Sequence, residues 1–159
     1  MNIVPLTQEQ ADYYLSVRKV RAEEQYYDIE QDLFRLHKFR VALKAKEVKD
    51  NSFFLDISQK KVILKVKCQF RSGNQNVILA RLDLYGSHRN PDGTEIGAPH
   101  LHLYSQEFGD KVAVPVPEGM LKNPNDPLQV IHDFIMKYNI EENGLFGVPT
   151  KAANLPLFQ

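Results

Sequence analysis

Hydrophobic and polar residues alternate along much of the middle of the chain. The clearest stretch runs from Val62 to Phe70, where every second residue is apolar and lysines or a glutamine fill most positions between them. A period of two places successive side chains on opposite faces of a strand, so the stretch indicates a strand with one apolar and one polar face. Similar alternation occurs over residues 39–43, 53–57, 78–84, 99–105 and 112–116. The pattern predicts an antiparallel sheet of five to six strands.

The N-terminal part carries a helix signal. Thr7 followed three residues later by Gln10 has the form of a capping box, in which each side chain satisfies a backbone N–H of the other residue. No Gly or Pro interrupts the chain from there to Glu30, so we expect a helix that ends at about Tyr27 or Glu30.

A second helix signal follows the predicted strands. Asp126 before Pro127 is typical of a helix start, because the carboxylate caps free N–H groups and proline suits the first helical position. The apolar residues Leu128, Ile131 and Ile135 then recur at helical spacing.

These elements predict a single α+β domain over residues 1–159. Its expected parts are an N-terminal helix over 1–32, an antiparallel sheet over 33–117, a helix over 126–140 and an irregular tail over 144–159 that docks on the body.

Composition narrows the class of protein. The chain has 159 residues, of which 43% are apolar and 25% charged, as in ordinary globular domains. No run reaches the roughly 18 apolar residues of a membrane span, and the N-terminus lacks the pattern of a secretory signal. A single cysteine, Cys68, excludes an internal disulfide. We therefore expect a cytoplasmic protein with no membrane contact.

The charges balance overall but are unevenly distributed. Residues 57–82 contain six basic and no acidic side chains, whereas residues 83–159 contain ten acidic and five basic ones. A dedicated nucleic-acid-binding domain usually has a strongly basic net charge, whereas the net charge of this chain is zero. We therefore do not expect direct nucleic-acid binding; if it occurred, it would use Lys60, Lys61, Lys65 and Lys67. The simpler interpretation is that these lysines form the solvated face of the sheet.

Three of the five histidines, His88, His100 and His102, lie within fifteen residues of one another. In a strand over 99–105, His100, His102 and Tyr104 share a face, and the two histidine backbones are about 6.5 Å apart. If the strand over 78–84 is its neighbour, Arg81 and Asp83 lie on the same polar face.

Several functions are compatible with this cluster. A metal site would use His100 and His102 with His88, Asp83 or Glu107 as a further ligand. A metal-free ribonuclease or phosphodiesterase would use two histidines as acid and base, with Arg81, Arg89 or Lys111 stabilising the phosphate. Alternatively, the histidines belong only to the wet face of the sheet, or the loop beside them binds a protein.

The block from His88 to Thr94, followed by that from Pro99 to Tyr104, resembles a small family of uncharacterised proteins carried by phages and mobile elements of Gram-positive bacteria. The resemblance covers about residues 60–117. It implies that the protein is encoded by a phage or mobile element, but it implies no particular activity. In size and general character the chain is also similar to anti-CRISPR proteins that bind the effector nuclease of type II systems.

We favour a non-enzymatic inhibitor that binds a larger protein, a host defence nuclease, in the bacterial cytoplasm and needs no cofactor. Segregated charge suits electrostatic steering onto such a partner. The expected contacts are Arg81, His88, Arg89, Asp92, His100, His102 and Tyr104, with Asp110, Glu118, Glu141 and Glu142 as further candidates. The alternative is a ribonuclease or metal-dependent hydrolase that uses His88, His100, His102 and Arg81, or a metal held by His100, His102, Asp83 and Glu107.

Overall fold

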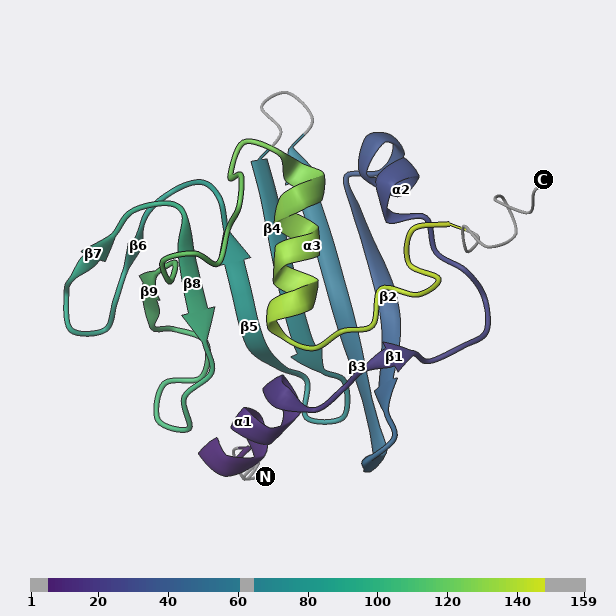
Figure 1. The fold of residues 1–159 in the computed structure, drawn as a ribbon. Helices are drawn as coiled ribbons and strands as arrows, with labels where there is room; N and C mark the ends of the chain where they lie inside the picture. The colour runs from purple at the N-terminus through teal and green to yellow at the C-terminus, as the bar shows by residue number, and fades with distance from the viewer. Residues whose placement is uncertain (1–5, 61–64, 148–159) are drawn as a thin grey trace.

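The computed structural model describes residues 6–60 and 65–147 and places most of its strands in one twisted antiparallel sheet (Figure 1). The sheet has seven strands in the order β1-β2-β3-β4-β5-β8-β9, and a separate hairpin of β6 and β7 lies beside it. The strands are β1 (Val20–Arg21), β2 (Lys38–Ala45), β3 (Val48–Lys60), β4 (Lys65–Ser72), β5 (Val77–Asp83), β6 (His88–Arg89), β7 (Glu95–Ile96), β8 (His100–Leu103) and β9 (Ala113–Pro115). The predicted α+β class is confirmed, with more strands than expected.

Alternation in the sequence corresponds to the two faces of the sheet. Along β4, Val66, Cys68 and Phe70 are buried, whereas Lys67 and Gln69 between them are only half-buried. The start of the predicted strand, with Val62 and Leu64, lies outside the described residues, as does Lys61.

The helices α1 (Gln8–Ser16) and α3 (Pro127–Lys137) both cover the apolar face of the sheet (Figure 1). From α3, Val130, Ile131, Phe134 and Ile135 are completely buried. In α1, the Tyr14 ring meets Phe53 edge-on at 5.2 Å, and Phe53 stacks on Phe70 at 5.5 Å between centroids. Across the described residues, the opposite face of the sheet carries no helix. No described helix has the length and apolarity needed to cross a membrane.

The expected helix from Thr7 to Glu30 is wrong beyond its first turns. Thr7 and Gln10 do form the capping box, but α1 ends at Ser16, and a short strand leads to α2 (Ile29–Arg35). Backbone pairing with distant segments overrides the helical preference: the N–H of Lys19 donates to the carbonyl of Asn139, and Val20 pairs with Lys44.

The expected helix after Asp126 is confirmed, and the segment over 144–147 docks as predicted. Asp126 caps α3 by accepting from the N–H groups of Leu128 and Gln129. Leu145 is buried, and its carbonyl accepts from the N–H of Ile29. The rest of the predicted tail lies outside the described residues.

Lys19 is completely buried where the chain leaves α1. Its Nζ donates to the carbonyls of Tyr14, at 2.7 Å, and Leu15, at 3.1 Å. It also lies 4.7 Å from the ring centroid of Phe70. Because burial removes water from the ammonium group, it lowers the pKa of Lys19 from 10.5 to about 7.

This depressed pKa predicts that the protein becomes more stable as the pH rises from about 7 to about 9. In that window the unfolded chain binds a proton at Lys19 that the folded chain has released, so raising the pH favours folding, by up to about 1.4 kcal/mol per pH unit. Urea unfolding at several pH values measures the slope. The unfolding free energy of Lys19→Met should lack this rise with pH. Identical slopes for the two proteins would contradict the lowered pKa of Lys19.

Candidate functional site

The polar face of the sheet brings Arg81, Asp83, His100 and His102 together, as the sequence predicts. Strand β8 pairs with β5 so that Asp83 lies opposite His100 and Arg81 opposite His102. The strand order also places Lys67, on β4, opposite Asp83. Because Leu82 and Leu101 point to the other face, the histidines lie away from the aliphatic core.

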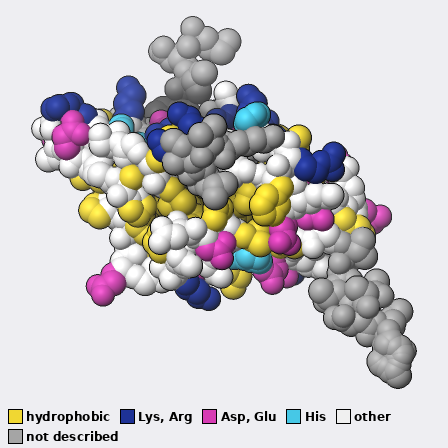
Figure 2. All heavy atoms as spheres, turned by 90° about the horizontal axis from the view of Figure 1, so that it is seen from above, with side chains coloured by type: hydrophobic (Ala, Val, Ile, Leu, Met, Phe, Trp, Pro, Cys, Tyr) yellow, Lys and Arg dark blue, Asp and Glu magenta, His cyan; other side chains and the backbone are white. Residues whose placement is uncertain are grey.

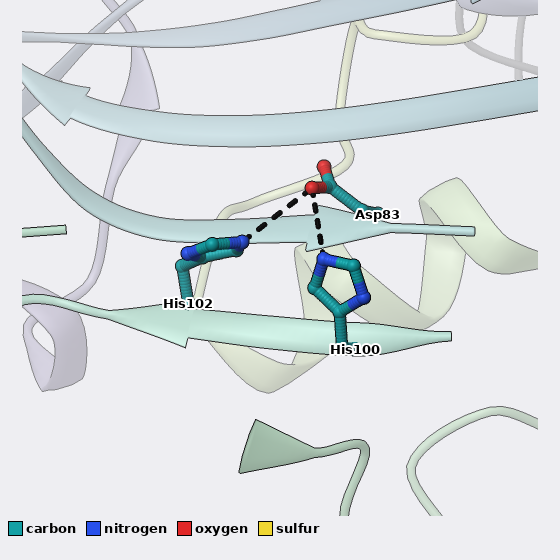
Figure 3. Close-up of side chains that lie close together, drawn as sticks. All are labelled: Asp83, His100 and His102. Carbon is teal, nitrogen blue, oxygen red and sulfur yellow. Dashed lines mark hydrogen bonds and ion pairs between the residues drawn. The ribbon is translucent and has the colours of Figure 1, made fainter. Parts of the chain in front are cut away.

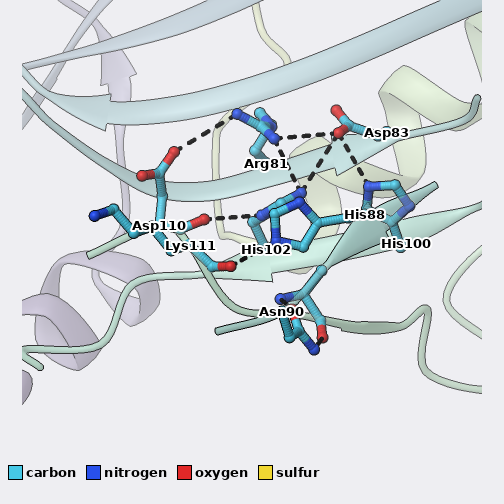
Figure 4. A network of polar contacts seen from close by, with 9 residues as sticks. Arg81, Asp83, His88, Asn90, His100, His102, Asp110 and Lys111 are labelled. Carbon is cyan, nitrogen blue, oxygen red and sulfur yellow. Dashed lines mark hydrogen bonds and ion pairs between the residues drawn. The ribbon is translucent and has the colours of Figure 1, made fainter. Parts of the chain in front are cut away.

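The cluster is buried, although a solvated face was the simpler expectation. His100 and His102 are 2% and 1% exposed, and Asp83 is 6% exposed. They lie beneath the segment that carries His88 and Asn90 and the loop that carries Asp110 and Lys111 (Figure 4). Direct contact between these histidines and a partner protein would therefore require those segments to move.

One carboxylate oxygen links the two histidines (Figure 3). Oδ2 of Asp83 lies 3.1 Å from Nε2 of His100 and 3.5 Å from Nε2 of His102. The guanidinium of Arg81 lies 3.0 Å from the same His102 nitrogen and 3.4 Å from Oδ2 of Asp83. Charged and neutral polar groups therefore lie in direct contact at a largely buried position.

Burial and neighbouring charges set the protonation of the cluster. Burial alone would raise the pKa of Asp83, but the neighbouring His102 and the charges of Arg81 and Lys67 hold that pKa below its ordinary value. Burial lowers the pKa of His100, outweighing the adjacent Asp83 carboxylate, which raises it. The site therefore combines an ionised carboxylate with a neutral imidazole at neutral pH.

Backbone carbonyls fix two of the imidazoles (Figure 4). Nδ1 of His102 lies 2.8 Å from the carbonyl of Asp110, and Nε2 of His88 lies 2.6 Å from the carbonyl of Lys111. His88 contacts His102 edge-on, with ring centroids 4.5 Å apart. Loop carbonyls thus orient side chains that belong to the sheet and the hairpin.

Asn90 holds the covering segment in place. Its side chain donates to the carbonyl of Ala113 at 2.9 Å and accepts from the N–H of Ala113 at 2.7 Å, so it pairs with β9 as a strand backbone would. The predicted turn over 90–93 is present, and Gly93 supplies a positive φ of 92°.

The other predicted contact residues are distributed around this cluster. Arg89 and Asp92 are exposed on the hairpin, where Arg89 pairs with Glu95 and Asp92 accepts from Thr94. Tyr104 does not share the histidine face: it lies beyond the end of β8, is buried, and donates its hydroxyl to the carbonyl of Leu6.

The acidic candidates are separated from one another. Asp110 lies 3.6 Å from Arg81, Glu141 pairs with Arg18, and Glu142 approaches His132. Glu118 is exposed. The group of possible metal ligands contains Asp83, His100 and His102 but not Glu107, which lies on the other side of β8.

The described lysines of the basic segment over residues 57–82 lie on the sheet face that carries no described helix. The ammonium groups of Lys60, Lys65 and Lys67 lie 5.3, 5.2 and 6.0 Å from the ring centroid of Tyr85. Arg40 makes two hydrogen bonds to Asp56, so this face carries charges of both signs. On the face shown in Figure 2, most of the visible Lys and Arg side chains lie along one long side, and most of the visible Asp and Glu side chains lie along the other.

A feature that sequence reasoning missed is an apolar groove of about 490 Å³ between α1 and the strands β8 and β9. Its walls include Leu103, Phe108 and Val114, which are 38%, 39% and 40% exposed. Asp12 and Glu107 also line it. The signal in the sequence was Phe108, an apolar residue within a Gly-Asp turn. Exposed apolar groups that adjoin one another are typical of interaction surfaces.

Comparison with known families matches residues 6–140 to a family of unknown function (DUF6978). No curated protein matches the chain significantly, and no solved structure does so either.

The paired hydrogen bonds of Asn90 predict that Asn90→Ala destabilises the fold by about 1–3 kcal/mol, because it leaves the N–H and carbonyl of Ala113 without partners. Arg89→Ala, next in the chain, removes an ion pair with Glu95 and a hydrogen bond to the carbonyl of Gly93, and it should cost less than about 1 kcal/mol because both contacts are at the surface. Urea unfolding of both variants measures the difference. Equal costs would show that the hairpin is not held through Asn90.

Proposed function

The chain belongs to DUF6978, a family of unknown function, and from the geometry we propose that it is a non-enzymatic protein that binds and inhibits a larger partner. The observation that carries this proposal is the groove between α1 and β8, where Leu103, Phe108 and Val114 are exposed together. An apolar centre with a polar rim is the usual composition of a protein-binding surface.

The rim of the groove indicates the chemistry of the partner. Asp12 and Glu107 are exposed acids beside the apolar side chains, so the groove suits a segment that carries both apolar and basic residues. Nucleic acid fits poorly, because a phosphate backbone would meet carboxylates there.

The specific partner that we propose is the effector nuclease of a type II CRISPR system. Such a nuclease holds its guide–target duplex in a positively charged channel, which provides basic surface complementary to this rim. The inhibitor would then act by occupying that surface, not by chemistry of its own.

The burial of the histidine cluster argues against acid–base catalysis by His100 and His102. The nitrogens of His100 and His102 that face the cluster lie against Asp83 and Arg81, and both rings are almost completely buried. A general acid or base must reach its substrate. Neither His100 nor His102 lines the groove along β2 to β4 or the smaller groove beside Arg71.

A metal-dependent hydrolase is the second candidate, because Asp83, His100 and His102 form a group of possible metal ligands. Stoichiometry separates the two functions. An enzyme turns over RNA or another phosphodiester at trace concentration and loses this activity in His100→Ala/His102→Ala. An inhibitor saturates at one chain per partner, and turnover by the wild-type chain would overturn the binding proposal.

The binding proposal predicts that Leu103→Ser/Phe108→Ser weakens the complex with a purified, guide-loaded type II effector nuclease by at least about tenfold. The matched control is Phe34→Ser/Met136→Ser, which removes two exposed apolar side chains elsewhere and should leave affinity unchanged. Titration calorimetry and inhibition of DNA cleavage provide the readouts. Equal affinities for the two double variants, or a homodimer formed through the groove, would contradict the proposal.

The acidic rim makes a separate prediction about association. Glu107→Lys should slow binding to the same nuclease and reduce its salt dependence, because the rim charge steers the encounter. Glu47→Lys changes the charge equally at an exposed position outside the groove, so its association rate should match that of the wild type. Stopped-flow measurements at two ionic strengths compare the variants; identical rates would remove the rim from the interface.

A further inference from the structure

We propose that Asp83, His100 and His102, together with His88, bind a divalent zinc-like ion. The ion would lie on the polar side of β8, whereas the partner groove lies on the other side. Each of the three central residues offers one ligand atom, and these atoms all lie within 4.8 Å of one another (Figure 3).

The distances within the cluster fit tetrahedral coordination. Ligand atoms about 2.0–2.2 Å from a tetrahedral zinc ion lie about 3.3–3.6 Å from one another. Oδ2 of Asp83 lies 3.1 Å from Nε2 of His100 and 3.5 Å from Nε2 of His102. Small movements would bring both of these distances into the range expected for zinc ligands. His88 lies outside this three-residue group, but its ring centroid is 4.5 Å from that of His102 and 6.1 Å from that of His100, so a small shift of its ring would offer a fourth ligand.

The surroundings of the imidazoles provide a second, independent observation. A carbonyl oxygen can only accept, so Nδ1 of His102 and Nε2 of His88 carry the hydrogens that point to Asp110 and Lys111. In the neutral ring the other nitrogen then carries a lone pair, which in His102 accepts from Arg81 at 3.0 Å. Histidines that bind metals are typically oriented in this way, with the second ring nitrogen donating to a carbonyl or carboxylate.

Arg81 occupies the position that an ion would need, and it has an alternative partner. Its guanidinium lies beside His102 and Asp83 but also 3.6 Å from the carboxylate of Asp110, on the outer side. Turning towards Asp110 would free the His102 nitrogen. Oδ1 of Asp83, which is buried and has no hydrogen-bond partner in the described part of the chain, gives the carboxylate further freedom to coordinate.

The donor set selects the class of ion. Three imidazoles and one carboxylate suit zinc and similar transition metals better than magnesium or calcium, which prefer oxygen ligands. Four protein ligands would close the coordination sphere. The ion would then fasten the hairpin of β6 and β7 to the sheet, which is a structural role.

Zinc titration of the full chain tests the proposal, with calorimetry and the visible spectrum of the cobalt-substituted protein as readouts. We expect one ion per chain and a zinc-dependent rise in thermal unfolding temperature. Asp83→Asn and His102→Ala should weaken binding by about 100-fold or more, and His88→Ala, at a half-buried position, by about tenfold. His37→Ala, an exposed histidine outside the cluster, is the matched control and should bind as the wild type does.

Arg81→Gln tests whether the cluster binds an ion in place of the guanidinium, or whether the guanidinium is itself the positive charge that the cluster needs. If an ion displaces Arg81, this variant binds zinc as tightly as the wild type or more tightly. The proposal is overturned if zinc leaves the wild-type unfolding temperature unchanged, if His37→Ala weakens binding as much as His102→Ala, or if Arg81→Gln abolishes binding.

Discussion

The structure depends on burying one face of an antiparallel sheet beneath α3 and α1. Phe53 and Phe70 stack at the centre of that face, and Phe134 and Ile135 of α3 are buried with them. Because side chains alternate along a strand, fixing the apolar face also fixes the polar one. Leu82 and Leu101 enter the core, and Asp83 and His100 are thereby opposed on the other face. The histidine cluster follows from the packing of the core.

Opposed polar residues are costly to bury unless their hydrogen bonds are satisfied. Here the missing acceptors come from loops: the carbonyls of Asp110 and Lys111 bind His102 and His88. Asn90 in turn ties the hairpin to Ala113. The covering segments and the cluster therefore stabilise one another, and loosening either would expose the other to water.

Strand β8 connects the two candidate sites. His100 and His102 point to the cluster, whereas Leu101 points to the core and Leu103 to the apolar groove. Next to it, β9 contributes Val114 to the groove and receives the hydrogen bonds of Asn90. Contacts that fix the position of β8 on its polar side also fix the shape of the groove on its other side. The proposed ion site and the proposed partner surface therefore both depend on the position of β8.

The sequence by itself determined the elements whose signals are local: the capping box at Thr7, the start of α3 at Asp126 and the alternation that separates His100 and His102 from the aliphatic residues. The pairing that unites Asp83 with His100 is compatible with the sequence, but the sequence does not require it. Only the tertiary structure decided that α1 ends at Ser16, that loops bury the histidines, that Tyr104 turns to Leu6, and that Phe108 borders a groove. The physical reason is that caps and alternation act between neighbours in the chain, whereas burial and hydrogen bonding depend on residues far apart in sequence, whose contacts form only on folding.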